Sequence, residues 1–367
     1  MALWRLAARG ATPLGIEQFA PGHDRGAGHG ESRIIRTAYA EGPEYVPLVR
    51  EAFGLWRRLE EETGTELLTM TGGLMIGRPD TDLVRGALES ARVHGLAHEV
   101  LDAPAMAARY PQFRLRDDEV ALLEADAGFL RPELAIVTAV RRATELGARI
   151  VTATRASSIS GGDGRHVTVR AARQSYEGRH AIVCGGAWNP SLLPGPASRI
   201  VVERKVMTWF EADDAGLFAL GRFPIFMWNR EGIEWYGFPS LDGATVKISV
   251  HLDGTERGAG IDPDHLDREA STEDLELVTR VVGAAFPHLR PAVVRSRVCM
   301  YALTPDLHFM IGRPAAMPAV TFLGGFSGHG FKFAPVIGDI AADLALEGAT
   351  ARPIDKFDPD RFSAATP

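Results

Sequence analysis

The chain has 367 residues, of which 46% are hydrophobic, and a formal net charge of -7 at pH 7. This length and composition are typical of a protein of about two domains with substantial cores. The negative charge argues against nucleic-acid binding, and the apolar runs are too short for a membrane span or a signal peptide. Two cysteines, Cys184 and Cys299, exclude a disulfide framework, so we expect a cytoplasmic protein.

Residues 1–200 alternate between helices and strands. Residues 4–11 predict a helix capped by Gly10, and residues 12–18 predict a short strand that closes on Glu17. The further expected elements are a glycine-rich loop at 19–36, a helix at 44–63, a hairpin at 67–77, a helix at 81–95, a helix and then a strand at 131–154, and a strand, a glycine turn and a helix at 180–193, with Cys184 in the core.

The pattern changes over residues 200–300, where short strands rich in aromatic residues indicate an antiparallel sheet. Within residues 244–252, strict alternation places Lys247 and His251 on the same face. A strand, a glycine-rich turn and a helix return at 319–346. These patterns predict a mixed α/β protein of two domains whose segments interleave along the chain.

Two residue types stand out in the last third of the chain. Cys299 lies in segment 296–312, where valines and a tyrosine favour a strand that "TPD" then ends. A lone cysteine in such a strand is most often a small buried hydrophobe. Lysine is scarce, because only four of the 40 basic residues are lysines. Lys332, inside a glycine-rich turn, is therefore expected to serve as a compact ammonium that arginine cannot replace.

Five segments resemble a known family in their order and spacing. They are "GHGESRIIRTAYAEGPEYVPL" (28–48), "WYGFP" (235–239), "VKISVH" (246–251), "VCMY" (298–301) and "GGFSGHGFKFAPVIG" (324–338). With them the chain resembles the monomeric sarcosine oxidase and N-methyl-amino-acid oxidase family over nearly its whole length. The resemblance implies FAD bound in a glutathione-reductase-like α/β domain, with a mixed or antiparallel sheet as the substrate domain. It also implies a monomer in which O2 oxidises a secondary amino acid, yielding an imine and hydrogen peroxide.

The resemblance and the change of pattern together set the expected domain boundaries. The FAD-binding domain takes residues 1–68, 134–200 and 306–367, and the substrate domain takes residues 69–133 and 201–305. The expected partners are a small amino acid and O2. No nucleic acid, membrane or metal is expected.

Residues near the cofactor follow from the same resemblance. The family attaches its flavin covalently to a cysteine at the position of Cys299. Lys247 matches a lysine that stabilises superoxide beside the flavin, and positive charge from Arg33 and His29 is expected to stabilise the reduced, anionic flavin. Lys332 is expected to lie near both flavin and substrate. From the residues alone, a core thiol, a solvent-facing lysine and ordinary loop residues remain alternatives.

The substrate residues also follow from the resemblance. Arg36 and Lys332 match the two cations that bind the substrate carboxylate, although Arg36 by itself is compatible with a surface salt bridge. His251 is expected to hydrogen-bond the substrate or tune its protonation, with a surface histidine as the alternative. The residues expected to line a small pocket are Met227, Tyr236, Tyr301 and Gly328, the last through its backbone. For the methionine and the two tyrosines, an ordinary place in the core of the sheet is the alternative.

Glu17 matches an acid that binds the cofactor, and from the residues alone a solvated carboxylate at the end of a strand remains the alternative. At the end of the second strand of a dinucleotide fold, such an acid accepts a hydrogen bond from a ribose hydroxyl, and a GxGxxG motif lies about 20 residues upstream. The sequence begins inside the helix that would follow that motif. We therefore expect the chain as given to bind FAD poorly and to aggregate, with a start codon assigned too late as the favoured explanation over a real truncated form.

The substrate and the class of function stay open. Sarcosine is the first choice because Met227, Tyr236 and Tyr301 keep the small-pocket pattern. N-methyltryptophan, or a cyclic imino acid such as pipecolate or proline, would fit a slightly different cavity. The alternative of another class is a flavin-free relative that acts as a binding protein. Colour distinguishes the two classes, because only the oxidase would be yellow.

Overall fold

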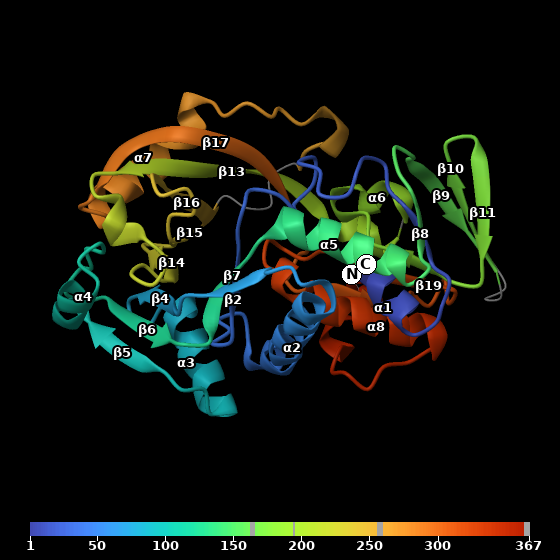
Figure 1. The fold of residues 1–367 in the computed structure, drawn as a ribbon, viewed down its shortest axis with the longest axis horizontal. Helices are drawn as coiled ribbons and strands as arrows, with labels where there is room; N and C mark the ends of the chain where they lie inside the picture. The colour runs from blue at the N-terminus through green and yellow to red at the C-terminus, as the bar shows by residue number, and fades with distance from the viewer. Residues whose placement is uncertain (162–165, 194, 255–259, 363–367) are drawn as a thin grey trace.

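The computed structural model describes residues 1–161, 166–193, 195–254 and 260–362 (Figure 1). The helices are α1 (Ala2–Ala8), α2 (Val46–Thr63), α3 (Asp82–His94), α4 (Ala103–Arg109), α5 (Pro132–Glu145), α6 (Asn189–Leu192), α7 (Thr272–Ala285) and α8 (Ala334–Leu346). The strands are β1 (Leu14–Ile16), β2 (Arg33–Arg36), β3 (Leu68–Met70), β4 (Gly73–Gly77), β5 (Glu99–Asp102), β6 (Val120–Glu124), β7 (Ala127–Leu130), β8 (Arg149–Val151), β9 (Ala156–Ser160), β10 (Val167–Ala171), β11 (Gln174–Gly178), β12 (Ala181–Val183), β13 (Val201–Ala212), β14 (Ile225–Arg230), β15 (Ile233–Gly237), β16 (Thr245–Leu252), β17 (Leu289–Leu303), β18 (Met310–Gly312) and β19 (Val320–Gly324).

Eight strands form the largest sheet, in the order β17-β13-β16-β15-β14-β4-β6-β5. They come from residues 73–124 and 201–303. Every neighbouring pair is antiparallel except β14 and β4, so the antiparallel sheet expected over residues 200–300 is confirmed. One face covers an aromatic core that includes Phe113, Phe226 and Trp228. On β16 the other face carries buried polar side chains, whereas on β4, β6 and β14 it carries a second apolar cluster that includes Met75, Leu122 and Met227.

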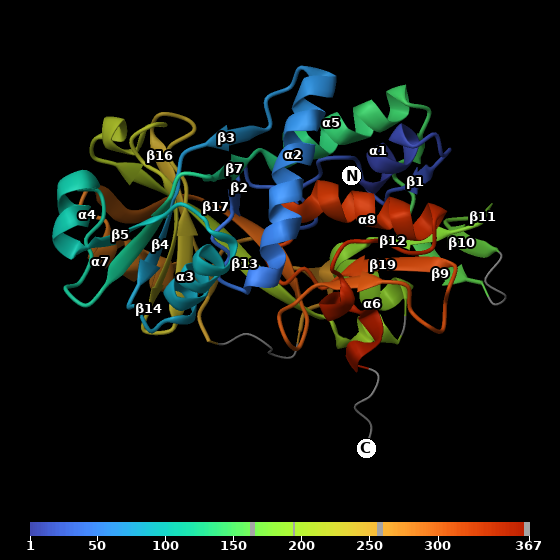
Figure 2. The same cartoon turned by 90° about the horizontal axis from the view of Figure 1, so that it is seen from below.

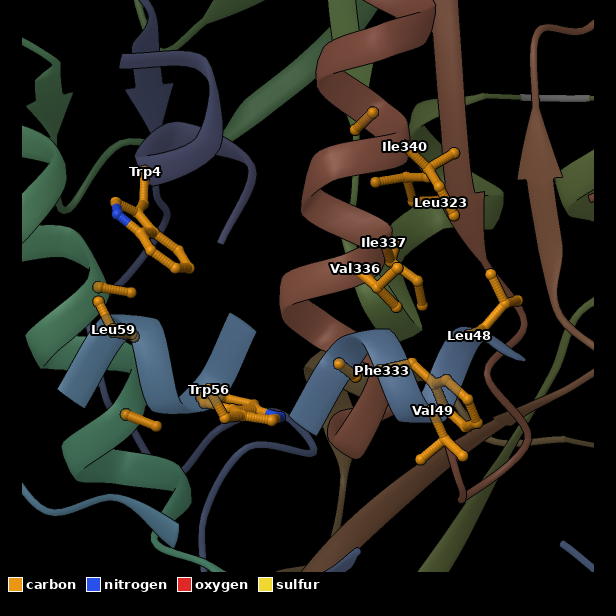
Figure 3. Packing of buried hydrophobic residues seen from close by; sticks show 14 of the residues in the cluster. Trp4, Leu48, Val49, Trp56, Leu59, Leu323, Phe333, Val336, Ile337 and Ile340 are labelled. Carbon is orange, nitrogen blue, oxygen red and sulfur yellow. The ribbon is translucent and has the colours of Figure 1, made fainter. Parts of the chain in front are cut away.

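The second part of the molecule is built on parallel strand pairs and helices. β1 pairs with β8, and β12 pairs with β19, both in parallel. Helix α8 is buried along nearly its whole length and packs against α1 and α2. Figure 3 shows the resulting core, where Trp4 of α1, Trp56 of α2 and Ile337 of α8 lie among other apolar side chains. Among the described residues, no helix is long and apolar enough to cross a membrane.

A small sheet of β2, β7 and β3 lies between these two parts (Figures 1 and 2). Strand β2 runs antiparallel to β7, with Arg33 opposite Leu130 and Arg36 opposite Ala127. The short strand therefore fixes two arginines at the junction between the large sheet and the helical part. It occupies the last four residues of segment 19–36, which was expected to be a glycine-rich loop throughout.

Two expectations from the sequence are wrong. Residues 67–77 do not form a hairpin, because β3 pairs with β7 whereas β4 pairs with β14 and β6. The chain passes from one sheet to the other at Gly72, whose φ of +70° suits glycine, and at Gly73, where a Cβ would lie 2.7 Å from Ala127. Cys184 is exposed instead of buried in the core, since it lies just beyond the end of β12.

Candidate active site

The candidate site is built on the polar face of β16. Lys247, Ser249 and His251 alternate along this strand and are all buried. Val246 and Ile248 point to the opposite face and belong to the aromatic core. The alternation that placed Lys247 and His251 on one face is thus confirmed. Burial of three polar side chains there shows that this face does not point to solvent, which excludes the alternative of a surface lysine and a surface histidine.

His251 joins the residues expected to line the pocket. Its Nδ1 lies 3.0 Å from the hydroxyl of Tyr301 on β17. Tyr236 on β15 lies edge-on to the imidazole, with ring centroids 6.2 Å apart, and it is paired across the sheet with Met227 on β14. Burial lowers the pKa of His251 to about 3, so the ring is neutral at pH 7. These four residues therefore form one continuous wall with a neutral imidazole in it.

The ammonium of Lys247 binds the loop that precedes β2. Its Nζ donates to the carbonyl oxygens of Gly30 at 2.7 Å and of Ser32 at 3.2 Å. The residue is only 3% exposed, and burial together with the nearby Arg33 lowers the pKa of Lys247 well below its usual value. A narrow pocket of about 10 Å³, space for about one water molecule, lies beside Lys247 and Phe238.

Cys299 lies within a strand, as predicted. It sits in β17 opposite Lys205 of β13, and its side chain is buried beside Met207 and Trp209. The Sγ atom is 4.0 Å from Nη2 of Arg33. A guanidinium therefore faces the predicted point of flavin attachment and would stabilise negative charge beside it.

His29 lies in the same loop, ahead of Arg33. It is buried, and burial together with the charge of Arg33 lowers the pKa of His29 to about 4. Its ring is therefore neutral at pH 7, so the expectation that His29 supplies positive charge is wrong, and the guanidinium of Arg33 is the cation of this loop. Among the described residues, Nε2 of His29 has no hydrogen-bond partner although it is buried.

Arg36 and Lys332 meet around Tyr39, although one lies in β2 and the other in a short helical turn, η6 (Phe331–Phe333). The guanidinium of Arg36 is 4.5 Å from the ring centroid of Tyr39, and Nζ of Lys332 is 5.1 Å from it. The same Nζ lies 3.3 Å from the Tyr39 hydroxyl. Burial and the charge of Arg36 lower the pKa of Lys332 to about 7. Two buried cations thus share one aromatic ring.

Glu41 partly compensates these cations. Its Oε2 accepts a hydrogen bond of 2.7 Å from Nη2 of Arg36. Burial raises the pKa of Glu41, but the charges of Arg36, His329 and Lys332 outweigh it and hold that pKa well below its usual value. Among the described residues, Nε of Arg36 is buried without a partner. Arg36 therefore keeps one donor for another anion.

Gly328 and Glu17 complete the predicted set. Gly328 has φ +81°, and a Cβ there would lie 2.5 Å from the ring of Tyr301, so only glycine fits between this turn and the pocket wall. Glu17 lies apart, directly after β1, where its Oε1 accepts the N–H of Phe19 at 2.8 Å and lies 3.6 Å from His23. Contacts and charge interactions connect the other predicted residues into one cluster.

Comparison with known proteins identifies the family to which the chain belongs. The family model for FAD-dependent oxidoreductases matches residues 1–344. The chain belongs to the FAD-dependent oxidoreductase family. A monomeric sarcosine oxidase of Streptomyces avermitilis is 41% identical over 366 residues, which cover 98% of this chain and 94% of that protein. An N-methyl-L-tryptophan oxidase of Salmonella heidelberg is 34% identical over 362 residues, which cover 96% of this chain and 93% of that protein. The family resemblance expected from the sequence is confirmed.

Solved structures share the fold of this FAD-dependent oxidoreductase. NikD, an unusual amino acid oxidase essential for nikkomycin biosynthesis, matches in its open form with a TM-score of 0.84 at 22% identity, over 98% of this chain and 93% of that chain. L-proline dehydrogenase from P. horikoshii matches with a TM-score of 0.81 at 21% identity, over 99% of this chain and 94% of that chain. At these identities the likeness establishes the mixed α/β fold alone.

The cluster fits the family's cofactor, FAD. The unpaired Nε2 of His29 and Nε of Arg36 are buried polar atoms, and leaving such atoms unsatisfied costs about 1–3 kcal/mol each. A flavin and a substrate carboxylate carry polar atoms that can form hydrogen bonds with these two nitrogen atoms. Arg33 and Lys247 add positive charge beside Cys299, where an electron-rich ring would be stabilised.

Three acids in this FAD-dependent oxidoreductase were missed from the sequence. Glu41 pairs with Arg36, and its position in the quoted segment 28–48 was the available signal. Glu124 is buried and its Oε2 accepts the N–H of Ala38 at 2.8 Å, which fixes the turn after Arg36. Glu133 accepts N–H groups of the loop that holds Lys247. No pattern marks the last two, because both appear as ordinary acids near strand or helix ends.

Proposed function

We propose that the protein oxidises a secondary amino acid, with sarcosine as the first candidate, and uses O2 as the final electron acceptor. The amine loses two electrons together with one hydrogen from carbon and one from nitrogen, so that its C–N bond becomes C=N. O2 gains two electrons and two protons and becomes hydrogen peroxide. Water then hydrolyses the imine to an aldehyde and an amine. The names of the curated relatives, monomeric sarcosine oxidase and N-methyl-L-tryptophan oxidase, support this proposal.

The observation that carries the proposal is the pair of buried cations beside a neutral imidazole. Arg36 and Lys332 converge on Tyr39, and Lys332 also acts electrostatically on His251. Two cations suit a carboxylate through charge-assisted hydrogen bonds. A carboxylate anchored there would hold its amino group toward the wall formed by His251 and Tyr301. Such anchoring supplies proximity and orientation, which can contribute several kcal/mol toward the barrier.

The charge of the site favours the reactive form of the amine. Burial lowers the pKa of Arg36, but Glu41 outweighs this effect and holds that pKa above its usual value, so this residue is charged, and Lys332 is charged below about pH 7. Like charges lower the pKa of a bound ammonium. His251 adds no further charge at pH 7 because its ring is neutral. Its Nδ1 lies 3.0 Å from the Tyr301 hydroxyl, and we assign Nε2 to a hydrogen bond with the amine of the substrate.

When bound, FAD supplies the acceptor for the hydride that leaves the substrate carbon. We place its covalent attachment at Cys299, with Arg33 and His29 along the ring and Glu17 on the ribose in a glutathione-reductase-like domain. Lys247 stabilises the negative charge that develops on oxygen as it is reduced. The proposed FAD-binding domain comprises residues 1–68, 134–200 and 306–367, the proposed substrate domain comprises residues 69–133 and 201–305, and the protein is proposed to act as a monomer.

A direct experiment tests the proposal. Because the chain as given is expected to bind FAD poorly, the protein is purified in the presence of added FAD. It is then precipitated with acid, and the flavin retained in the pellet is measured. Oxygen uptake and peroxide formation are then followed with sarcosine, N-methyl-L-tryptophan, proline and pipecolate. We expect a yellow pellet and one peroxide formed per oxygen consumed with sarcosine. A protein that is colourless and inactive with all four compounds would favour a flavin-free binding protein and overturn the proposal.

A second substrate is supported by a separate observation. Curated relatives named N-methyl-L-tryptophan oxidase are 34% identical to this chain over 362 residues, a level close to that of several sarcosine oxidases. If the kcat/KM for N-methyl-L-tryptophan exceeds that for sarcosine, this second substrate replaces the first. The carboxylate anchor and the oxygen chemistry are the same for both.

A further inference from the structure

The loop that holds Lys247 is itself held by an acid on another element. Glu133 lies in the first turn of α5, and its Oε1 accepts the N–H of Gly30 at 2.6 Å and the N–H of Glu31 at 3.2 Å. On the other side of the same turn, the carbonyl oxygen of Gly30 accepts from Nζ of Lys247 at 2.7 Å. A single backbone turn thus links a carboxylate to the buried ammonium.

The conformation of this turn needs external support. Gly30 has φ +96° and Glu31 has φ +72°, and the left-handed region costs a non-glycine residue about 1 kcal/mol or more. The side chain of Glu31 is held as well, because its Oε1 lies 2.5 Å from Nη1 of Arg295 and its Oε2 accepts from Nε1 of Trp209 at 3.1 Å. The turn points its N–H groups at Glu133 and its carbonyl oxygens at Lys247.

The charged and titratable groups around Lys247 come from several elements. Arg33, on the strand after the loop, opposes its charge, while Glu31, Glu133 and Cys299 favour it. The remaining groups near it are His29 in the loop, Asp242 at the adjacent narrow pocket, and Arg295, which stacks on Trp209. Glu133 therefore acts on Lys247 in two ways, through the geometry of the turn and through its negative charge.

We propose that Glu133 is a positioning residue for Lys247. By accepting hydrogen bonds from the Gly30–Ser32 turn, Glu133 fixes that turn, and the carbonyl oxygens of the turn then hold the Lys247 ammonium where oxygen is reduced. This inference rests on the role of Lys247 proposed above. In the part of the chain that the structure describes, the hydrogen bonds of Glu133 go to the N–H groups of Gly30 and Glu31, and none goes to Arg36 or Lys332. Its loss is therefore expected to affect the reaction with oxygen and to spare the reaction with the amine.

The experiment uses two substitutions in the flavin-loaded full chain. Glu133→Gln keeps an oxygen acceptor but removes the charge, and Glu133→Ala removes both. Glu145→Gln, at the exposed far end of the same helix, is the matched control. Anaerobic reduction by sarcosine and reoxidation by O2 are measured separately by stopped flow across pH 6–10. Hydrogen exchange of a peptide containing residues 28–33 reports the turn independently of activity.

We expect Glu133→Ala to slow reoxidation roughly 10-fold or more and to change anaerobic reduction less than 2-fold, with faster hydrogen exchange in the turn. The ammonium form of Lys247 is the active one, so reoxidation falls as pH rises through its pKa. Removing a nearby anion lowers that pKa. The fall in Glu133→Gln should therefore begin about half a pH unit or more lower than in the unmodified protein, and Glu145→Gln should show no shift.

The outcomes separate this inference from the proposed function. If Lys247→Met slows reoxidation but both Glu133 variants reoxidise normally with an unshifted pH profile, the positioning role is overturned while the proposed function stands. Equal slowing of both half-reactions by Glu133→Ala would also overturn it, because that result indicates general disruption. If Lys247→Met itself reoxidises normally, the proposed role of Lys247 fails first. Should Glu133→Ala not fold, Glu133→Gln still decides through its pH profile.

Discussion

Replacing Lys332 by methionine tests the carboxylate anchor most directly. The ammonium is 5% exposed, and burial and Arg36 bring its pKa to about 7 in the protein without substrate. Below pH 7 the side chain of Lys332 is already protonated. Above pH 7 this side chain is neutral and must take up a proton before it can bind a carboxylate as a cation. Each pH unit above 7 then costs about 1.4 kcal/mol. We expect the Kd of a carboxylate without an amine, such as acetate, to be flat from pH 6 to 7 and to rise up to about tenfold per unit above it.

The variant Lys332→Met has a size similar to lysine but no charge. A hydrogen bond to a charged group contributes about 1.5–3 kcal/mol, so acetate should bind roughly 10- to 150-fold more weakly at pH 6. The rise in Kd above pH 7 should also disappear. Binding is followed through the flavin absorbance of the loaded protein. Lys356→Met, which removes a half-exposed lysine paired with Glu44, is the control. An unchanged Kd in Lys332→Met, or a pH-independent Kd in the unmodified protein, would refute the argument.

Three further predictions concern the cofactor, the oxygen reaction and stability. Cys299→Ser should release all flavin on acid precipitation while the fold is kept, and flavin retained in that pellet would place the attachment elsewhere. Lys247→Met should slow reoxidation by O2 far more than anaerobic reduction in stopped flow, and a normal reoxidation rate would remove the lysine from this role. Asp339→Asn should lower the free energy of unfolding by about 3 kcal/mol in urea titrations, because the buried carboxylate is paired with Arg5 at 2.9 Å and Arg352 at 2.7 Å; an unchanged midpoint would contradict this.

Local patterns in the sequence predicted the elements that carry their own periodicity. The helix expected at 44–63 is α2, and the alternation around Lys247 is that of β16, because apolar spacing in each reflects one buried face. The hairpin expected at 67–77 failed for the opposite reason. Both strands exist, but neither pairs with the other. Strand β3 pairs with β7, more than 50 residues away in the chain, and β4 pairs with β14, which is still farther away. The local pattern of residues holds no information on such distant pairing.

The candidate site divides in the same way. Arg36 and Lys332 were predicted from motifs, and the structure brings them to one ring. Glu133 escaped prediction because its role depends on a loop about 100 residues earlier, as its bonds to Gly30 and Glu31 show. An acid in the first turn of a helix already has a local explanation in the helix dipole, which conceals any longer-range contact.

The meeting of Arg36 and Lys332 at Tyr39 has a consequence for synthesis of the protein. Tyr39 and Lys332 are 293 residues apart, and Lys247 lies 217 residues beyond Gly30. At translation rates of about 5–20 residues per second, Lys332 is synthesised roughly 15–60 s after Arg36. A nascent chain of between 130 and 331 residues contains β2 and its partner β7 but not Lys332, the second cation for an amino acid. Binding of an amino acid by both cations would thus begin only when nearly the whole chain has left the ribosome.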